Sequence, residues 1–514
     1  MTFQETPQRL ALFDWVRQGT GSLMLQAVAG SGKTTAMVGG ETKDGERIPG
    51  IVDCIPDSQD VVVVAFNKEI AEIFKKRTEH RTNVRGGTCH SVGFAAYRRF
   101  RPGVRVDEKK VDKLIDQMVI PEEKARSYRS YIKKMVALAK AHGLGTKLMD
   151  DTPENWFLLR DHYDIYLDQE SAAFTEREAM NWTIRILQAS QQQVGVIDFD
   201  DMLYMPLFYD ASFYKNDWVI VDEAQDTNAV QLEMIKRMLR KGGRVVAVGD
   251  ERQSIYSFRG ADSEAMKKIK ETFGASELPL SVTWRCGKKI VEVAKPMCPQ
   301  LEAAPDAKDG VVSVETIPED VTKLFPRMEP DDAVLCRTTA PLVSLAYQMI
   351  GAGKGCRILG KEIGKGLIAL IDRMKARTLD TLTERLAAYE QREAAKWTAA
   401  DEESRAQAVI DRVRCIQIAM ERLPEDQRTV DALKTSLDAL FSDNGKSGDK
   451  RRILTLSTVH KAKGKEYGRV WVWRADLMPL KWARKPHQIR EESNVRYVAF
   501  TRAKDELILL NGAG

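Results

Sequence analysis

Long apolar stretches are absent from this chain of 514 residues. No run approaches the roughly 20 apolar residues that a helix needs to span a bilayer. The first letters, MTFQETPQRL, also lack the basic-then-apolar order of a secretory signal. We therefore expect a cytoplasmic protein with no membrane partner.

Cysteine and histidine are also scarce, with seven and six residues. No two cysteines form a CxxC pair, which argues for a reducing compartment and against a disulfide framework or a zinc site. Hydrophobic residues make up 43% of the chain and charged residues 30%, as in folded globular proteins, and the length predicts about three or four structural units. The net charge of +5 permits a nucleic-acid partner without requiring one, because a local basic channel is what matters.

One phosphate-binding motif stands near the N-terminus. Ser22–Val28 reads as a buried strand, and AGSGKTTAM follows it at once. Residues 30–34 match the end of a P-loop at a strand-to-helix turn, where backbone N–H groups surround phosphates. Lys33 would reach the β- and γ-phosphates, and Thr34 would hold Mg²⁺. Ala27 stands where this motif normally begins with glycine.

A second motif follows the apolar run Trp218–Val221, which ends in the letters DEAQD. Paired acids after a strand are often only a solvated turn. Here they supply the carboxylates that a P-loop lacks: Asp222 for the metal and Glu223 to polarise the attacking water. The two motifs together predict a nucleotide-hydrolysing site.

A third segment, GDERQSIYSFRGA, follows the apolar run Val245–Val248. Polar groups at the carboxyl end of a strand suit ligand binding in an α/β sheet. Its aromatic residues, Tyr256 and Phe258, are either core residues or flat surfaces for a ligand. Taken alone, core packing is the better interpretation of these aromatics.

These three motifs together resemble those of the UvrD/Rep/PcrA-like superfamily 1A DNA helicases. Further segments resemble other motifs of the family and follow the family's order: VVAFNKEIA, TCHS, LSVTWRC, LCRTTA, STVHKAKGKEY and EESNVRYVAFTRA. Gln8, within ETPQRL, matches the glutamine of the N-terminal Q motif. The chain departs from the usual family residues at Cys89, Phe258, Trp284 and Lys465, where Phe, Trp, Tyr and Leu are more common.

The resemblance assigns residues to an ATP and Mg²⁺ site. Catalytic roles go to Lys33, Glu223, Gln253 as γ-phosphate sensor, and Arg285 and Arg502 as arginine fingers; loss of such a finger costs about 10³–10⁵ in rate in other nucleotide hydrolases. Metal binding goes to Thr34 and Asp222. The nucleotide-binding residues are Gln8, Ala29, Gly30, Ser31, Gly32, Lys33, Thr34, Thr35, Trp284, Arg285 and Glu466.

The resemblance also implies a path for single-stranded DNA. Its candidates are Phe66, Asn67, Thr88, His90, Tyr256, Phe258, Arg259, Thr458 and His460. Tyr256 and Phe258 would stack on bases, which all have a flat face whatever their sequence. Core packing stays an alternative for Tyr256, and the two histidines could be structural.

The fold implied by the resemblance is α/β, with two RecA-like P-loop domains, each a parallel sheet flanked by helices, and two mainly helical inserted subdomains. The first domain would comprise residues 1–94 and 196–275, interrupted by insertion 95–195; the second would comprise 276–360 and 450–514, interrupted by the short insertion 361–449. Strands are expected at 61–65, 333–336, 453–457 and 469–473, besides those named above. In the second insertion, Val409, Val413, Ile416 and Met420 share one helix face.

The resemblance implies an ATP- and Mg²⁺-dependent translocase and DNA helicase that moves 3′-to-5′ and binds single-stranded DNA and single-strand/duplex junctions. One alternative is a translocase that displaces proteins from DNA with little strand separation. Another is a nucleic-acid-binding regulator that uses ATP only as a clamp. A P-loop kinase or transporter ATPase ranks below these, because neither explains the segment from Gln253 to Arg259. Repair and replication both remain open as pathways.

Overall fold

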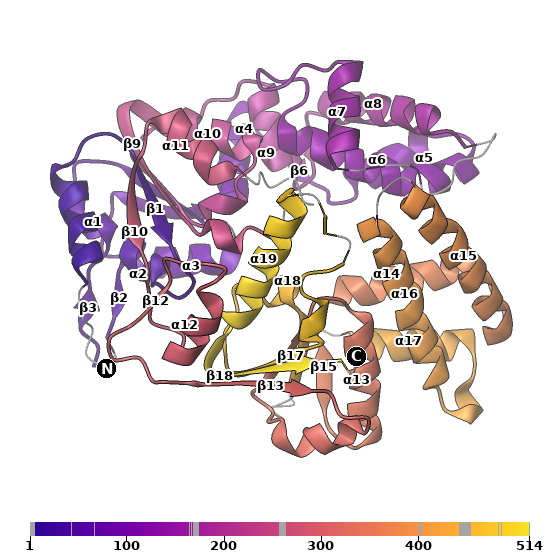
Figure 1. Ribbon diagram of the computed structural model, residues 1–514. Helices are drawn as coiled ribbons and strands as arrows, with labels where there is room; N and C mark the ends of the chain where they lie inside the picture. Colours follow the sequence, from indigo (N-terminus) through magenta and orange to yellow (C-terminus); the bar gives the residue numbers. More distant parts are fainter. Residues whose placement is uncertain are drawn as a thin grey trace. The chain divides into compact units, whose positions relative to one another are not determined.

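The computed structural model describes residues 6–42, 44–65, 67–163, 165, 167, 174–255, 264–399, 403–441, 454–481, 483–484 and 486–512. The chain divides into two compact units (Figure 1). The first consists of Met1–Val28 and Gly32–Ser281, and the second of Ala29–Ser31 and Val282–Gly514. Each unit is built around its own six-stranded sheet.

The sheet of the first unit is parallel throughout. Its spatial order is β10-β1-β9-β8-β4-β5. The strands are β1 (Leu23–Ala27), β4 (Val61–Ala65), β5 (Val84–Thr88), β8 (Asn216–Val221), β9 (Leu239–Gly249) and β10 (Ser276–Leu280). Strand β10 lies in this sheet although the predicted division places its residues in the second domain.

Helices cover both faces of this sheet (Figure 1). Val61 and Val63 of β4 pack on one side against α1 (Pro7–Gln18), α2 (Lys33–Val38) and α3 (Lys68–Arg77). Val62 and Val64 point to the other side, because successive side chains of a strand alternate between faces. That side is covered by α4 (Cys89–Phe100), α9 (Asp201–Phe208), α10 (Ala229–Met238) and α11 (Ala265–Phe273). Burial on both faces explains why the central strands are continuous apolar runs.

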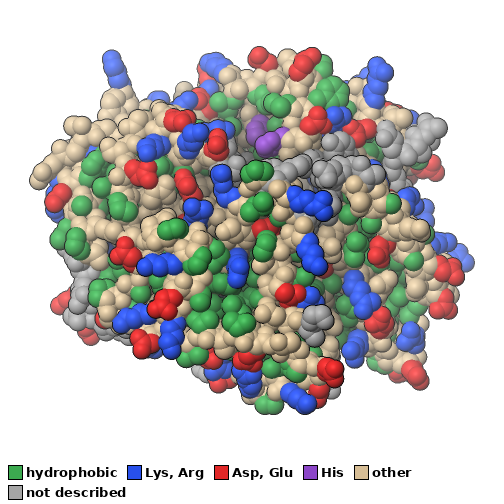
Figure 2. Space-filling model, in the orientation of Figure 1, with side chains coloured by type: hydrophobic (Ala, Val, Ile, Leu, Met, Phe, Trp, Pro, Cys, Tyr) green, Lys and Arg blue, Asp and Glu red, His purple; other side chains and the backbone are tan. Residues whose placement is uncertain are grey.

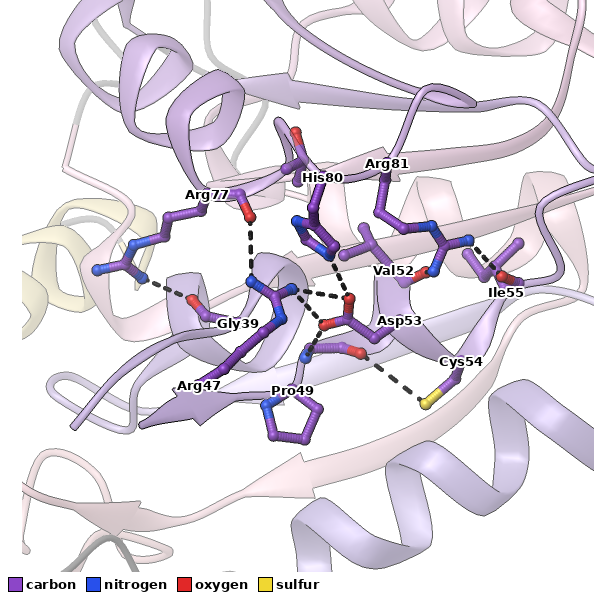
Figure 3. Close-up of polar contacts among 12 residues, drawn as sticks. Gly39, Arg47, Pro49, Val52, Asp53, Cys54, Ile55, Arg77, His80 and Arg81 are labelled. Atoms are coloured by element: carbon purple, nitrogen blue, oxygen red, sulfur yellow. Dashed lines mark hydrogen bonds and ion pairs between the residues drawn. The ribbon is translucent and has the colours of Figure 1, made fainter. Parts of the chain in front are cut away.

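A polar cluster anchors the carboxyl end of the short helix α2, which follows the P-loop (Figure 3). A two-stranded ribbon, β2 (Gly40–Glu41) and β3 (Arg47–Ile48), comes directly after this helix. Asp53 accepts hydrogen bonds from Arg47 at 2.8 and 2.9 Å, and lies 2.9 Å from Nε2 of His80. Arg77 of α3 donates to the carbonyl of Gly39 at 2.8 Å, which ties the end of α2 to its neighbour.

The first helical insertion consists of α5 (Lys110–Met118), α6 (Glu122–His142), α7 (Pro153–His162) and α8 (Glu176–Gln192). The two-residue strands β6 (Arg105–Val106) and β7 (Val196–Ile197) pair in parallel at its two ends. Apolar side chains from all four helices form one core with residues of α4 and α9. The insertion therefore shares its core with helices of the first sheet.

A buried ion cluster joins this insertion to α9. Nζ of Lys110 lies 2.7 Å from Asp201, and Nζ of Lys140 lies 2.6 Å from Asp198 and 2.8 Å from Asp201. The two lysine side chains are 1% exposed and that of Asp201 is 0% exposed. Burial by itself would raise the pKa of Asp201, but the two ammonium groups outweigh it and lower that pKa below its usual value.

The sheet of the second unit is also parallel throughout, in the order β13-β18-β17-β14-β16-β15. Its strands are β13 (Val311–Thr316), β14 (Ala333–Cys336), β15 (Cys356–Ile358), β16 (Leu454–Thr458), β17 (Tyr467–Trp473) and β18 (Ala503–Asn511). Its helices are α12 (Lys288–Ala294), α13 (Ala340–Gly351), α18 (Val459–Ala462) and α19 (Pro486–Phe500), and a ribbon of β11 (Val282–Thr283) with β12 (Glu302–Ala303) stands apart. Two parallel, helix-flanked sheets confirm the predicted fold class.

The second insertion holds α14 (Lys361–Met374), α15 (Leu379–Ala399), α16 (Glu403–Glu421) and α17 (Val430–Leu440). The predicted apolar face of α16 is buried: its four residues are at most 7% exposed, which confirms the periodicity. Asp411 of the same helix accepts hydrogen bonds from the backbone N–H groups of Thr339 and Ala340, each at 3.0 Å. This carboxylate caps α13 and fastens the insertion to the second sheet.

Charged side chains of both signs are interspersed on the face that Figure 2 draws. Among the described residues of that face, no broad area carries a single sign of charge. Within the described parts of the chain, none of the helices combines the length and the apolar character needed to cross a membrane.

Candidate nucleotide and nucleic-acid sites

The P-loop follows β1 and opens helix α2 at Lys33. Gly30 and Gly32 have φ angles of 74° and 81°, in the left-handed region that favours glycine. The hydroxyl oxygen of Ser31 is buried and has no hydrogen-bond partner among the described residues. A buried hydroxyl without a protein partner in a glycine-rich turn is a candidate phosphate ligand.

Lys33 lies among carboxylates of the first unit. Its Nζ is 3.3 Å from each carboxylate oxygen of Glu223. Burial would lower the pKa of Lys33, but Glu223, Asp250 and Asp222 outweigh it and raise that pKa. The ammonium group is therefore charged, and it is positioned to contact phosphate once those carboxylates share it with a ligand.

Asp222 and Glu223 follow directly after β8. Burial, reinforced by the neighbouring carboxylate of Glu223, raises the pKa of Asp222 to about 7. Glu223 itself has a φ of 48°, a left-handed conformation that is uncommon for any residue other than glycine. Such backbone conformations cluster at functional sites, where the surroundings hold them in place.

The donor set fits a magnesium ion. Thr34 offers a hydroxyl and Asp222 a carboxylate, both hard oxygen ligands of the kind Mg²⁺ takes together with water and substrate phosphates. Three acidic side chains act on Lys33, and burial raises the pKa of two of them, Asp222 and Asp250. A nearby divalent cation would favour the ionised form of these acids.

Asp250 and Gln253 follow β9, the strand that lies between β1 and β8 in the sheet. Nε2 of Gln253 donates to Asp250 at 2.7 Å. The backbone N–H of Asp250 donates to Oε1 of Gln225 at 2.9 Å. Nε2 of Gln225 in turn donates to the carboxylate of Glu223. The residues after β8 and β9 thus form one hydrogen-bonded set.

Gln8 of α1 is bonded at both ends of its amide to Ser281. Its Nε2 donates to the Ser281 hydroxyl at 2.8 Å, and its Oε1 accepts from the Ser281 backbone N–H at 2.9 Å. These bonds fix which way the amide faces. One N–H and one oxygen lone pair of the amide remain for an adenine edge.

Within the second unit, Arg285 donates to Glu466 at 2.7 Å, and Lys504 lies 2.6 Å from the same carboxylate. Burial would raise the pKa of Glu466, but the two cations outweigh it and lower that pKa. Arg502 is buried, and its guanidinium donates to the carbonyls of Val498 and Lys465, both at 3.1 Å. These side chains gather at the amino ends of β17 and β18.

Ala29 and Trp284 are the two remaining nucleotide candidates of this unit. The backbone N–H of Trp284 donates to the carbonyl of Gly30 at 2.9 Å, and that of Ala29 donates to the hydroxyl of Tyr497 at 3.0 Å. Trp284 is 41% exposed, a high value for so large an apolar residue.

The DNA candidates of the first unit follow β4 and β5. Asn67 caps α3 by accepting from the N–H of Ile70 at 2.9 Å, and Thr88 caps α4 by accepting from that of Ser91 at 3.1 Å. His90 is half-buried, and burial lowers its pKa. The side chains of Asn67 and Thr88 therefore both have a structural role as helix caps. Phe66, Tyr256, Phe258 and Arg259 lie outside the described residues.

The DNA candidates of the second unit lie at the carboxyl end of β16. Thr458 is the last residue of that strand, paired with Cys336 at the end of β14, and His460 is in the short helix that follows. Thr458 and His460 are therefore at the carboxyl ends of the strands, whereas the cluster around Glu466 is at the amino ends. The two groups of candidates in this unit are thus separated by the length of the strands.

Comparison with known proteins identifies the family. Residues 11–274 match the UvrD/REP helicase N-terminal domain, which covers just over half of the chain. The chain belongs to the UvrD/Rep helicase family. Residues 372–511 match the UvrD-like helicase C-terminal domain, as expected for a UvrD/Rep protein. The family assignment made from the motifs is confirmed.

Relatives of this UvrD/Rep chain include DNA helicase II of Haemophilus influenzae, 26% identical over 295 residues, or 53% of this chain and 38% of the relative. The ATP-dependent DNA helicase Rep of Escherichia coli is 26% identical over 293 residues, or 54% of this chain and 41% of the relative. The ATP-dependent DNA helicase SRS2 of Saccharomyces cerevisiae is 26% identical over 325 residues, 56% of this chain and 26% of the relative. In each case, the match spans less than half of the relative's length.

Sequence reasoning missed two residues of this UvrD/Rep site, Gln225 and Asp250. Both are buried and connect predicted residues to one another. Both lie inside the motif letters, DEAQD and GDERQ, so their position was visible. Their role was not, because a contact between the turns after two different strands leaves no periodic pattern.

Proposed function

We propose that this chain is an ATP- and Mg²⁺-dependent motor that translocates 3′-to-5′ along single-stranded DNA and separates the strands of a duplex. The observation that carries the proposal is the order of side chains along one edge of the first sheet. The P-loop, Gln253 and Glu223 follow β1, β9 and β8. Asn67 follows the next strand, β4, and Thr88 is the last residue of β5 beside it. Ligands bind at the carboxyl edge of such sheets. A nucleotide site and a strand-binding path would thus share that edge.

In this proposal, ATP hydrolysis depends on Glu223 and Lys33. The Glu223 carboxylate accepts hydrogen bonds from Lys33 and Gln225. In the proposed reaction, this carboxylate would accept a proton from the attacking water and so polarise that water. Lys33 would move from Glu223 to the phosphates, leaving the carboxylate free for that water. The magnesium ion, when bound, neutralises charge on the phosphate oxygens. Thr34 and Asp222 would hold it.

Arg285 and Arg502, both in the second unit, would act as arginine fingers on the γ-phosphate. Each guanidinium now donates within that unit, Arg285 to Glu466 and Arg502 to backbone carbonyls. A finger role requires these bonds to be exchanged for phosphate contacts, so hydrolysis would depend on a rearrangement. Trp284 would stack on the adenine, and Gln8 would read its edge.

The DNA-binding residues would contact the backbone and bases without reading sequence. Asn67, Thr88 and Thr458 offer polar groups at strand ends, while Tyr256 and Phe258 would supply stacking surfaces. We expect single-stranded DNA and single-strand/duplex junctions as substrates and a cytoplasmic location. The four-segment domain division stays part of this proposal, except that residues 276–280 belong with the first sheet.

The second candidate is a translocase that removes proteins from DNA with little strand separation. The observation in its favour is the second insertion, whose described residues form only four α-helices between β15 and the described start of β16. A regulator that uses ATP as a clamp is less favoured, because it would not need the carboxylate of Glu223.

Two assays separate these candidates. The first measures strand displacement from duplexes with a 3′ tail, a 5′ tail or no tail. The second measures the release of a protein block from the end of single-stranded DNA. A helicase should open the 3′-tailed duplex, and Glu223→Gln should not. Release of the block without opening of any duplex would select the protein-displacing translocase, and activity on the 5′ tail alone would contradict the proposed direction.

A further inference from the structure

Gln225 lies between two parts of the site and is only 1% exposed. It belongs to the one-turn helix Ala224–Asp226 that follows β8. Its Nε2 donates to the carboxylate of Glu223, two residues away. Its Oε1 accepts from the backbone N–H of Asp250, at the end of β9, at 2.9 Å. One amide thus joins the turns after two neighbouring strands.

The end of β9 is shaped to admit this amide. A Cβ atom at Gly249 would lie 2.6 Å from Oε1 of Gln225 and 3.1 Å from its backbone nitrogen. Both distances are shorter than an ordinary contact, so a side chain at this position would push the amide away. The absence of a side chain at 249 therefore permits the bond to the next residue, Asp250.

The hydrogen bonds continue from Asp250 toward the segment that follows. Asp250 accepts from the side chain of Gln253 at 2.7 Å and from the backbone N–H of Arg252 at 3.0 Å. The carboxylate of Asp250 is buried, as are the amides of Gln225 and Gln253. Buried polar networks of this kind hold one arrangement, because a broken bond leaves an unsatisfied group. A displacement of Gln253 would therefore move Asp250 and, through it, disturb the hydrogen bond to Gln225.

The other end of the network is a residue in an unusual conformation. Glu223 has a left-handed backbone, with φ at 48° and ψ at 44°. Its side chain is held by Lys33 on one side and by Gln225 on the other. Lys33 is the group expected to move to a phosphate. Gln225 would then remain as the neighbour that orients the carboxylate.

We propose that Gln225 is a positioning residue that sets the orientation of the Glu223 carboxylate and couples it to the segment beginning at Asp250. The inference rests on the proposed function, in which Glu223 polarises water and Gln253 responds to the phosphate. In this role Gln225 contacts no substrate. It makes the rate of hydrolysis depend on the arrangement of the residues from 250 to 255, which lead toward the candidate stacking residues.

The test compares two substitutions at this position with a matched control in the full-length chain. Gln225→Met keeps the length but removes both the donor and the acceptor. Gln225→Glu keeps an acceptor for Asp250 but replaces the donor to Glu223 with a second carboxylate. Gln231 is the control, since it is also a buried glutamine of the first unit and its Oε1 accepts from the N–H of Asn228 at 2.9 Å in a helix cap.

We expect both substitutions of Gln225 to lower kcat for ATP hydrolysis roughly 10- to 100-fold, the loss that a small misplacement of a reacting group produces. The KM for ATP should stay within about twofold of the wild type, because the P-loop contacts are untouched. The ratio of rates with and without single-stranded DNA should also fall in Gln225→Met. Gln231→Met should shift the melting temperature without changing kcat.

Wild-type kcat in either Gln225 variant would overturn the positioning role. So would a loss of kcat that is matched by the same loss in Gln231→Met at an equal drop in melting temperature. The proposed function fails separately: if single-stranded DNA does not change the wild-type rate, a DNA motor is wrong. The effect of Gln225→Met on kcat without DNA then still decides the positioning role.

Discussion

Replacing Asp201 with Asn should destabilise the first unit strongly, because it removes the carboxylate shared by two buried lysines. The pairs with Lys110 and Lys140 measure 2.7 and 2.8 Å, and all three side chains are at most 1% exposed. Removal of one partner of a buried ion pair costs about 3–5 kcal/mol, since the remaining charge is left uncompensated. Lys140 keeps its pair with Asp198, so the uncompensated charge here is that of Lys110. For a unit of this size, such a loss lowers Tm by about 10 °C.

Glu277→Gln provides the matched control. Its pair with Lys270 has the same distance of 2.7 Å, but the two side chains are 41% and 47% exposed. Exposed pairs contribute little, because water and salt screen them. Thermal melting of both variants in one buffer measures the difference that burial makes. Equal melting temperatures for Asp201→Asn and Glu277→Gln would refute the reasoning.

The pH dependence of the melting temperature, compared between wild type and Asp201→Asn, gives an independent check. The pKa of Asp201 is lowered in the folded chain, so its contribution is fully present above the unfolded value of about 3.9 and is lost as the pH falls through the folded value. The gap in Tm between wild type and Asp201→Asn should therefore be constant near neutral pH and should narrow below about pH 4. A gap that widens in acid would contradict the assigned sign.

Three further predictions concern the ligands. Phe258→Ala should weaken single-stranded DNA binding by about 1–3 kcal/mol while ATP hydrolysis without DNA and the melting temperature stay unchanged; a large melting loss with DNA binding intact would instead indicate a core residue. Gln253→Ala should still bind DNA, as measured by fluorescence anisotropy, but the strand should no longer accelerate hydrolysis; retained acceleration would rule out the sensor role. Gln8→Ala should raise the KM for ATP and reduce the preference for ATP over GTP, and an unchanged preference would show that Gln8 does not read the base.

The strands that could be predicted from the sequence are those buried on both faces. Val61–Ala65 and Ala333–Cys336 have the predicted bounds, and both are internal strands of their sheets. Such strands are continuous apolar runs. The resemblance to the helicase family then supplied their grouping into two parallel sheets.

The missed strands are mainly those at the edges. Strand β10 contains Pro279, and β5 contains Gly86 and Gly87. Both stand at the edges of the first sheet, where a missing backbone donor or side chain is tolerated. Strands β13 and β15 are likewise the edges of the second sheet. The internal strand β18 begins with the charged letters AKDE, which hid its apolar second half.

The candidate site shows the same division. Lys33, Asp222 and Glu223 could be found because their chemistry is carried by residue type and by position after a strand. Gln225 could not, because its role depends on the turn after β9 coming within 2.9 Å of its amide. A sequence shows which groups follow each strand. Which of these groups touch is determined by how the strands are ordered in the sheet.

The most direct test of the proposed function is the rate of ATP hydrolysis with and without single-stranded DNA, for the wild type and for Glu223→Gln. The substitution preserves shape but removes the charge that polarises water. We predict that DNA accelerates the wild type, and that Glu223→Gln binds ATP and DNA normally yet hardly turns over. A wild-type rate that ignores DNA, or a Glu223→Gln rate close to the wild-type rate, would contradict the account.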